Sequence, residues 1–516
     1  MYRRKTCSQL DLFTQEAPIM DVLDEDDEII KLAHAIDWDY VDEIYSRYFE
    51  GTSSRGNPNA ISSRVAFGAL FVKQYLGLSD RETYQEIKRS PYWQYFLGMD
   101  TFSSKLPFQP SYMTAFRKRF PEDVMELVNN YHAKQVRSKK KSDSDDNDGN
   151  PSSGSSQSSD SSASGGEEPE TEGVVIIDAT CCEADIAFPT DINLLNKSRL
   201  WLERIVDHLY REFGSLKKNG TKPRTYRKEA RNKYHKFVKH PRQRKTKTMR
   251  AAVGEQLNYI KRDLGYIDQY FGLSEEAEQI LLPVEARRLE AVRLVYEQQT
   301  EMHKNRKHVV SDRIVSLSQP WIRPIVRGKQ KAKTEFGAKL SISVADGYTF
   351  VDQLTFNAYN EGEHGEFVMA IEKYRERFGH YPAKVLADTI YGNRKNRAWC
   401  KERGIYLSAE KLGRKPKNQN ADRKQRAKDI SERNEVECKF GNLKRRFGLD
   451  LVTSKLEETS KTEIYFSIFV MNMTRKVRTE EPGLFVWLGF GPFFPVRTTG
   501  RNQGYPDFGD SRNRFA

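Results

Sequence analysis

The sequence predicts two folded parts, an all-α N-terminal domain and a larger α/β domain with a helical insertion. Capped helical patterns fill residues 60–136, and a serine-rich stretch follows them. Beyond that stretch, short β-branched runs alternate with helical patterns, which is typical of an α/β domain. A long helical pattern interrupts the second part at about residues 193–306. The length of 516 residues suggests about three domains.

The serine-rich stretch marks the clearest boundary in the chain. Ser142–Ser164 holds eleven serines in 23 residues, and such a composition cannot bury enough apolar surface to offset its chain entropy. We therefore expect a flexible linker here. The expected divisions are a partly disordered N-terminal segment at 1–59, a helical DNA-binding domain at 60–136, the linker at 137–171, the α/β domain at 172–480 and a tail at 481–516.

The composition excludes several classes of protein. Aromatic residues make up 11% of the chain, which excludes a wholly disordered protein. No apolar run approaches the roughly eighteen residues of a membrane-spanning helix, and the N-terminus lacks the apolar segment of a signal peptide. The five cysteines show no metal-ligand spacing. We expect a soluble, cytoplasmic protein without a membrane partner.

Basic residues are concentrated in two runs. The net charge is +13, and Lys217–Arg250 holds fifteen Lys and Arg against a single acid, Glu229. A second basic run is Lys411–Arg426. Such segregation favours binding to a phosphate backbone, although a solvated surface would show the same pattern. The residues we assign to phosphate contacts in the first run are Arg242, Arg244, Lys245 and Lys247.

Helix-start signals divide the N-terminal domain into four helices. The first begins at Ser62-Ser63 and stops at Gly77, and the capping box Ser79–Glu82 opens the second. The other starts are Ser90-Pro91 and Pro110-Ser111. Two helices joined by a short turn are typical of a DNA-binding helix-turn-helix, but an ordinary helical hairpin has the same pattern.

Two buried strands and a hairpin are predicted after the linker. The β-branched run Val174–Ile177 ends at Asp178, and Lys384–Ala387 ends at Asp388. Alternating residues at 339–344 lead into Asp346-Gly347, a two-residue hairpin turn.

The predicted helices of this part lie between and after those strands. They are His364–Phe378, Asn393–Glu402, a long helix around Glu437, and a last helix Ile464–Val477 opened by a capping box at Ser460–Glu463. In the insertion, Leu257, Ile260, Leu264 and Ile267 follow helical spacing, which we interpret as core packing.

Asp178 and Asp388 are the first candidates for chemistry. A carboxylate that follows a run of Val, Ile and Leu is costly to desolvate unless a positive charge meets it. Two such acids at strand ends in one domain suggest a shared divalent cation. For either acid alone, the simpler interpretation is that it opens the following turn, where Asp is common.

Glu437 is the third candidate. At about 100° per residue, a stripe of Val436, Phe440, Leu443 and Phe447 forms the buried side of one helix. Glu437 lies at one edge of this stripe with Arg433 and Lys444, whereas Glu435 lies on the opposite flank. Such a group could hold a metal and a scissile phosphate, although a surface salt bridge would give the same spacing.

Taken in order, these residues resemble a DDE transposase of the bacterial insertion-sequence type. The third motif of that family is Tyr-x2-Arg-x3-Glu-x6-Lys, which Arg433, Glu437 and Lys444 match, whereas Ile430 occupies the Tyr position. Further similarity to the insertion-sequence-five group lies in Leu386–Asn393, Arg323–Lys329, Glu335–Lys339, Leu76–Asp80 and Phe116–Phe120.

The resemblance implies an RNase H-like catalytic domain with a mixed five-stranded sheet. Asp178 would lie on the first strand, Asp388 after the fourth and Glu437 on a following helix. These three carboxylates would hold two Mg²⁺ ions, for which Mn²⁺ can substitute. Arg433 and Lys444 would contact DNA.

The implied function is that of a transposase that binds the ends of an insertion sequence and catalyses metal-dependent DNA strand cleavage and strand transfer. Its partners would be double-stranded DNA, as transposon ends and target, and further copies of itself in a homodimer or higher oligomer on DNA. Such a protein would associate with the nucleoid. The alternatives are a catalytically inactive, transposase-derived DNA-binding protein or regulator, and another RNase H-like nuclease such as a junction resolvase, which the third-motif spacing disfavours.

Overall fold

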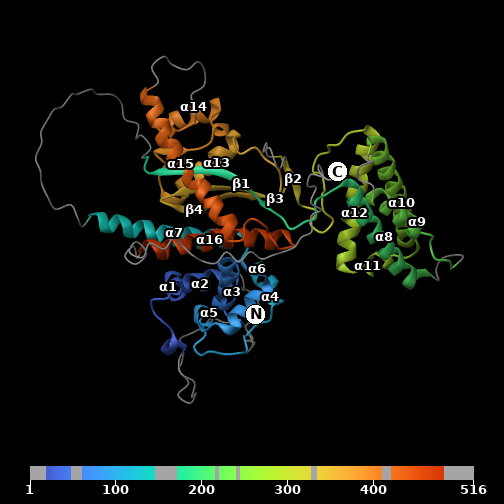
Figure 1. Cartoon of the computed structure of the whole chain (residues 1–516), viewed down its shortest axis with the longest axis horizontal. Helices are drawn as coiled ribbons and strands as arrows, with labels where there is room; N and C mark the ends of the chain where they lie inside the picture. Colours follow the sequence, from blue (N-terminus) through green and yellow to red (C-terminus); the bar gives the residue numbers. More distant parts are fainter. Residues whose placement is uncertain are drawn as a thin grey trace, which may run out of the picture.

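The computed structural model describes residues 19–47, 61–145, 171–214, 220–239, 245–326, 334–409 and 420–480. Figure 1 shows three regions, which are a group of N-terminal helices, a central sheet with its covering helices, and a helical insertion to one side of the sheet. None of the helices in the described ranges combines the length and the apolar character that crossing a membrane requires.

The N-terminal helices begin and end where their capping residues predict. They are η1 Ile19–Val22, α1 Glu28–Ala35, α2 Trp38–Arg47, α3 Ser63–Leu76, α4 Asp80–Arg89, α5 Pro91–Phe96, α6 Tyr112–Arg119 and α7 Glu122–Asp145. Ser62 caps α3, Gly77 ends it in the left-handed conformation, and Ser79 with Glu82 forms the capping box of α4. The four predicted helix starts are therefore confirmed.

The helical region extends further along the chain than we expected, in both directions. Helices α1 and α2 lie within the segment that we expected to be partly disordered. Helix α7 runs to Asp145, past residue 137 where we placed the start of the linker. Arg and Lys at 137–141 favour helix, and the serine-rich composition begins only at Ser142. The rest of the expected linker, apart from Thr171, and the tail at 481–516 lie outside the described residues.

A mixed sheet of six strands forms the centre of the described part of the chain. The strands are β1 Val174–Glu183, β2 Arg323–Val326, β3 Thr334–Ala345, β4 Tyr348–Thr355, β5 Lys384–Leu386 and β6 Tyr406–Leu407. Strand β3 is antiparallel to β1, β2 and β4, whereas β1, β5 and β6 are parallel. The short strand β2 is additional to the five strands that we expected.

The predicted Asp-Gly turn joins β3 to β4. Asp346 and Gly347 have φ values of 51° and 82°, as a two-residue hairpin turn of this kind requires. A Cβ atom on Gly347 would lie 1.9 Å from the Arg475 guanidinium. The backbone conformation therefore favours glycine here, and the Arg475 guanidinium would have to move to admit a side chain.

Helices cover both faces of the sheet. They are α13 His364–Phe378, η4 Thr389–Tyr391, α14 Arg394–Glu402, α15 Asn420–Arg446 and α16 Glu457–Glu480. Side chains alternate along β1, so that Ile177 packs in the cluster containing Phe367 of α13, while Ile176 packs in the cluster containing Val436 of α15. The face that includes Ile176 and α15 also carries the candidate acids.

The insertion is helical, as predicted. It consists of α8 Asp191–Phe213, α9 Arg227–Lys239, α10 Thr246–Leu273, α11 Glu276–Gln279 and α12 Pro283–Asn305. The predicted stripe on α10 is buried in a hydrophobic cluster that α8, α10 and α12 share. This cluster is separate from those that flank the sheet, and Figure 1 shows the insertion beside the sheet.

Helix α16 joins the N-terminal helices to the sheet. It packs against α3, α6 and α7 and also against β4, and a single hydrophobic cluster continues from the N-terminal helices through α16 to the sheet. The predicted capping box at Ser460–Glu463 is wrong, because α16 already begins at Glu457 and Glu463 forms a buried ion pair with Lys73 of α3 at 2.8 Å. Residues 60–136 therefore share their core with the sheet.

Candidate active site

Asp178 and Asp388 occupy equivalent positions on neighbouring parallel strands. Ile176 of β1 is paired with Leu386 of β5, and each aspartate lies two residues further along its strand. Because side chains alternate, both aspartates lie on the face of the sheet that carries Ile176 and Leu386. Asp388 directly follows β5, is exposed, and accepts a hydrogen bond from the Thr389 N–H at 2.7 Å.

Asp178 does not end its strand, contrary to our prediction. Strand β1 continues to Glu183, and Asp178 lies opposite Ile342 of β3 in its middle. Only the pairing of β1 with β5 ends before Asp178. The residues after Asp178 stay extended because β3 is long enough to pair with them on the other edge.

Helix α15 brings Glu437 to the same face. Val436, Phe440, Leu443 and Phe447 are buried, as the helical spacing predicts. Glu437 is exposed at the edge of this stripe, whereas Glu435 lies 3.8 Å from Lys439. Lys439 in turn donates a hydrogen bond to the Gly347 carbonyl of the hairpin.

The charges of the other two acids act on the pKa of Asp178. Burial raises the pKa of Asp178 to about 6, and the Glu437 and Asp388 carboxylates add to this rise. The Ala179 N–H and the Arg433 guanidinium act in the opposite direction. Arg433 lies on α15, and its Nη1 is 4.0 Å from Asp178 Oδ2. The charge of Asp178 is therefore only partly compensated.

The donor set fits a divalent cation, although a complete coordination shell is not formed. Carboxylate oxygens are the ligands that Mg²⁺ and Mn²⁺ prefer, and a cation would relieve the repulsion that Asp178 experiences. In the described ranges, however, no three His, Cys, Asp or Glu side chains are grouped so that they could hold a metal ion. The three acids lie on one face of the sheet, and the charges of Glu437 and Asp388 act on Asp178. Their side chains are not grouped closely enough to hold a metal ion as they stand.

Tyr391 is a neighbour of Asp178 that periodicity and charge patterns do not reveal. It lies in η4, directly after Asp388, and is buried with no hydrogen-bond partner for its hydroxyl among the described residues. Burial, followed by the charge of Asp178, raises its pKa. The backbone around it is held by Asn396, whose Nδ2 donates to the carbonyls of Tyr391 and Gly362.

Gly362 allows this loop to lie against η4. A Cβ atom at this position would be 2.4 Å from the Ile390 carbonyl oxygen. A side chain there would push Ile390 and the η4 turn away from the sheet edge, and Asp388 begins that turn. The sequence signal for this is the segment Asn360-Glu-Gly362, which indicates only a loop.

The other residues that we assigned to DNA lie on α15 and in the insertion. Lys444 is half-buried on α15, two turns beyond Glu437. Lys245 and Lys247 are exposed at the start of α10, in the insertion and away from the sheet. Arg242 and Arg244 lie outside the described residues, as does most of the second basic run.

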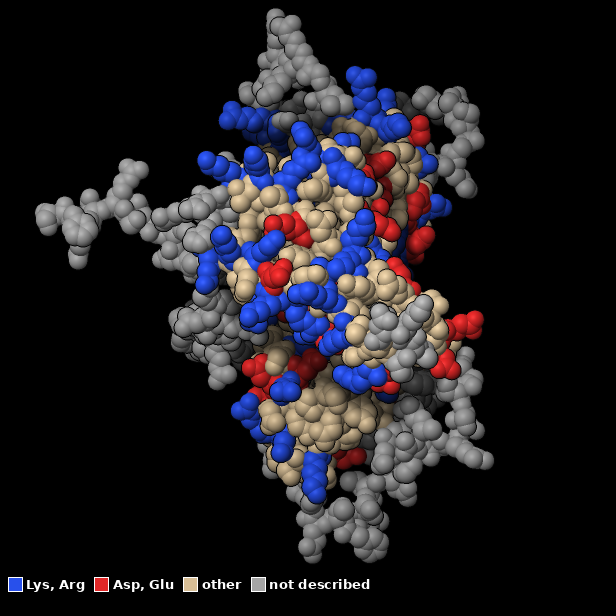
Figure 2. Space-filling model, turned by 90° about the vertical axis from the view of Figure 1, so that its right-hand side faces the viewer, with Lys and Arg blue, Asp and Glu red and all other residues tan. Residues whose placement is uncertain are grey.

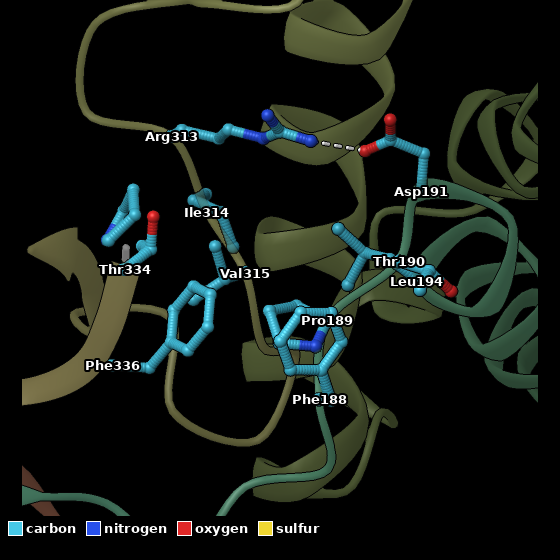
Figure 3. Close-up of a pocket in the computed structure, with 11 residues that line it drawn as sticks. Phe188, Pro189, Thr190, Asp191, Leu194, Arg313, Ile314, Val315, Thr334 and Phe336 are labelled. Carbon is cyan, nitrogen blue, oxygen red and sulfur yellow. Dashed lines mark hydrogen bonds and ion pairs between the residues drawn. The ribbon is translucent and has the colours of Figure 1, made fainter. Parts of the chain in front are cut away.

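A separate cavity of about 210 Å³ lies where the insertion joins the sheet. Figure 3 shows Phe188 and Phe336 on one side and the ion pair between Arg313 and Asp191 on another. Asp191 also accepts a hydrogen bond from Gln299 at 2.8 Å. The polar groups of Asp191 and Arg313 are thus used to attach α8 to the returning chain, and none of the three candidate acids lines this cavity.

Replacing Asp178 by Asn is expected to stabilise the metal-free protein at pH 8 by about 1–3 kcal/mol, because a raised pKa means that folding disfavours the charged carboxylate. The gain in stability of Asp178→Asn over the unmodified protein should grow as pH rises from about 4, because the ordinary pKa of Asp is 3.8. The gain should be complete above about pH 6, the pKa of Asp178 in the folded protein. Urea unfolding in the presence of a chelator would measure it.

The matched control for this change is Asp185→Asn. Asp185 lies just beyond β1 and pairs with Lys455 at 2.7 Å, and both side chains are about half exposed. Removing this charge should change stability by less than about 1 kcal/mol. Loss of stability in Asp178→Asn at pH 8 would mean that Arg433 compensates Asp178 fully.

Two family models match parts of this chain. Residues 18–119 match the family model described as Transposase domain (DUF772), and residues 385–474 match the one described as Transposase DDE domain. The second match contains Asp388 and Glu437, whereas Asp178 precedes it. Two separate parts of this chain are thus similar to transposase domains.

Part of this chain is also similar to a protein of Rhizobium meliloti. The "Uncharacterized protein ORF8 in nfe locus" of Rhizobium meliloti is 25% identical over 195 residues, which cover 38% of this chain and 78% of that protein. No solved structure matches the chain.

Proposed function

We propose that this protein is an active DDE transposase, which binds the ends of an insertion sequence and catalyses metal-dependent strand cleavage and strand transfer. The observation that carries the proposal is the placement of Asp178, Asp388 and Glu437 on one face of the sheet, with the charges of the two other acids acting on Asp178. Asp388, Glu437 and the neighbouring Arg433 lie within the region that matches the transposase DDE domain.

The strand order supports an RNase H-like class for the catalytic domain, as the resemblance implies. Strand β4 pairs with the edge of β3 opposite β1, so that five strands follow the order β4-β3-β1-β5-β6. Asp178 lies on β1, which is the first strand along the chain. Asp388 follows β5, which is the fourth of these five strands along the chain. The short β2 extends the edge of β3 without changing this order.

In the proposed mechanism, Asp178, Asp388 and Glu437 would hold the divalent ions. When bound, such ions would supply activation of water or of a 3′-hydroxyl and stabilisation of the charge that develops on the phosphate. At pH 7 and above, Asp178 is mostly ionised, because its pKa is about 6. Arg433 orients the Asp178 carboxylate and offers a charge to the phosphate, and Lys444 follows two turns later on α15.

We further propose duplex contacts from two other regions. Helix α4 buries only Thr83 and Ile87 and so presents most of its surface outward, which suits the second helix of a helix-turn-helix. The exposed Lys245 and Lys247 of the insertion, with Arg242 and Arg244 before them, would contact phosphates. The protein would act on DNA as a homodimer or higher oligomer.

One observation favours the alternative of a DNA-binding protein without catalytic activity. The three carboxylates do not form a finished metal-binding group among the described residues. A regulator derived from a transposase would bind the same ends and leave them uncut. The following experiment separates these two functions.

Purified full-length protein should cut duplexes that carry the inverted repeats flanking its own reading frame, in Mg²⁺ or Mn²⁺ and not in a chelator, because the carboxylates alone cannot activate water. Products would be resolved on denaturing gels, and binding would be followed by mobility shift. Specific binding without cutting in either cation would establish the regulator, and cutting in the chelator would contradict the metal site.

A further inference from the structure

Helix α9 lies on the outer surface of the insertion and has little core of its own. Ala230 is the one fully buried residue in its whole length, Arg227–Lys239. The helix rests on α8 and α10, which form the core beneath it. Thirteen residues of the first basic run, Arg227–Lys239, thus form a helix. Two ion pairs and a hydrogen bond from Tyr234 to Asn193 of α8, at 2.8 Å, orient that helix.

The cations at the sides of α9 are paired with the helices below. Arg227 donates two hydrogen bonds to Asp207 of α8, at 2.9 and 2.8 Å, and Lys233 reaches Glu255 of α10 at 3.3 Å. These contacts fix the rotation of the helix about its axis. As a result, one particular set of residues is turned away from the insertion.

That outward set is cationic and uncompensated. At about 100° per residue, Lys228, Arg231, Lys236 and Lys239 lie within one arc opposite Ala230, and all four are exposed. Lys228, Lys236 and Lys239 form no ion pair with any described residue. The single acid of the helix, Glu229, lies at the border of this arc. Figure 2 shows this side of the molecule, where Lys and Arg are widely spread.

The cations on the outward face lower the stability of α9 unless an anion binds to them. Like charges on one face repel one another, and a helix with one buried residue gains little stability from packing. The outward cations extend over residues 228 to 239, or roughly 16 Å at about 1.5 Å per residue. A row of phosphates along a DNA backbone presents regularly spaced negative charge over this length.

We propose that the outward face of α9, defined by Lys228, Arg231, Lys236 and Lys239, binds the phosphate backbone of duplex DNA. This inference rests on the proposed function, since it names the surface on which that substrate lies. Arg227 and Lys233 are positioning residues, which orient the helix and whose charges are already neutralised by Asp207 and Glu255.

The test compares two double variants of the full-length protein that remove equal charge from the same helix. They are Lys228→Gln with Lys236→Gln on the outward face, and Arg227→Gln with Lys233→Gln at the sides. Glutamine keeps the helix propensity near that of lysine and arginine. Affinity for a duplex is measured against salt concentration in a chelator, so that cutting plays no part.

The outward variant should flatten the slope of log affinity against log salt by about 0.9 for each phosphate that it no longer neutralises, and weaken binding by roughly 60-fold at about 0.1 M salt. Its melting temperature should not fall, because it relieves repulsion. The side variant should melt earlier and keep a slope closer to that of the unmodified protein. Equal slopes in the two variants, or an unchanged slope in the outward one, would overturn the proposal.

These outcomes are independent of catalysis. Should the unmodified protein fail to cut any end duplex while the outward variant still loses salt dependence, the proposed enzyme activity fails and the DNA surface stands. Should cutting occur while both variants bind as the unmodified protein does, the activity stands and the DNA path lies elsewhere.

Discussion

Replacing Glu437 by Gln is expected to reduce cleavage of an insertion-sequence end by about a thousandfold, while affinity for the same duplex changes by less than about twofold. Glutamine keeps the shape of the side chain but removes the charge that would hold a divalent ion. A loss of about 4 kcal/mol of transition-state stabilisation corresponds to a factor of about a thousand in rate. Single-turnover cleavage at saturating protein would measure it.

Glu435→Gln is the matched control, since it makes the same change two residues earlier on α15. Glu435 lies on the other flank and pairs with Lys439, not with the sheet acids. Its loss should change the cleavage rate by less than about threefold, because Glu435 contacts Lys439 and Lys439 keeps its hydrogen bond to the Gly347 carbonyl. If Glu435→Gln were the inactive variant and Glu437→Gln the active one, the assignment of the third acid would be reversed.

Signals of short range predicted most of the local structure. Caps such as Ser62, Ser79 and Asn393 set helix starts, because a cap depends only on residues within one turn. The Asp346-Gly347 turn set the β3–β4 hairpin for the same reason. The helix His364–Phe378 was predicted to the residue.

Long-range pairing accounts for what the sequence could not predict. The predicted strand stops at Asp178 because the run of Val and Ile ends there, whereas pairing with β3 keeps the chain extended to Glu183. Glu463 matched a capping box, yet its partner Lys73 lies 390 positions away. A local pattern cannot distinguish a cap from a buried ion pair.

The residues of the candidate site stay a prediction from the sequence, and their geometry could not be predicted from it. The order of Asp178, Asp388 and Glu437, and the choice of Glu437 over Glu435, follow from spacing along strands and helices. The distance between carboxylates does not, because it depends on how β1, β5 and α15 pack together. Tyr391, which is buried in the cluster that contains Phe367, gives no signal beyond its place after Asp388.

The shared core gives α16 a role in linking the two predicted domains. Thr462 donates to the carbonyls of Arg117 and Phe120, and Asn472 connects Asn129 of α7 with Thr349 of β4. The N-terminal helices thus have a fixed position relative to the face that carries the acids. If those helices recognise a DNA end, the end is delivered at a defined place on the sheet.

Replacing Lys73 by Met is accordingly expected to lower the free energy of unfolding by about 3–5 kcal/mol, because it leaves the Glu463 carboxylate buried without its partner. Burial alone would raise the pKa of Glu463, but Lys73, Ser454 and Arg117 outweigh it and lower the pKa to about 2. The pair therefore contributes stability above about pH 4.5, and this is lost as pH falls toward 2. Urea unfolding at pH 7 and 4 would measure both effects.

Two further variants make the interpretation of Lys73→Met secure. Lys461→Met removes another lysine of α16 that pairs across to the N-terminal helices, with Glu122 at 2.8 Å, but at a partly exposed site, so it should cost less than about 1 kcal/mol. Adding Glu463→Gln to Lys73→Met should recover much of the loss, because no unpaired charge then stays buried while Ser454 keeps an acceptor. A Lys73→Met variant no less stable than Lys461→Met would show that water reaches Glu463 and that α16 is not the closed core that joins the helices to the sheet.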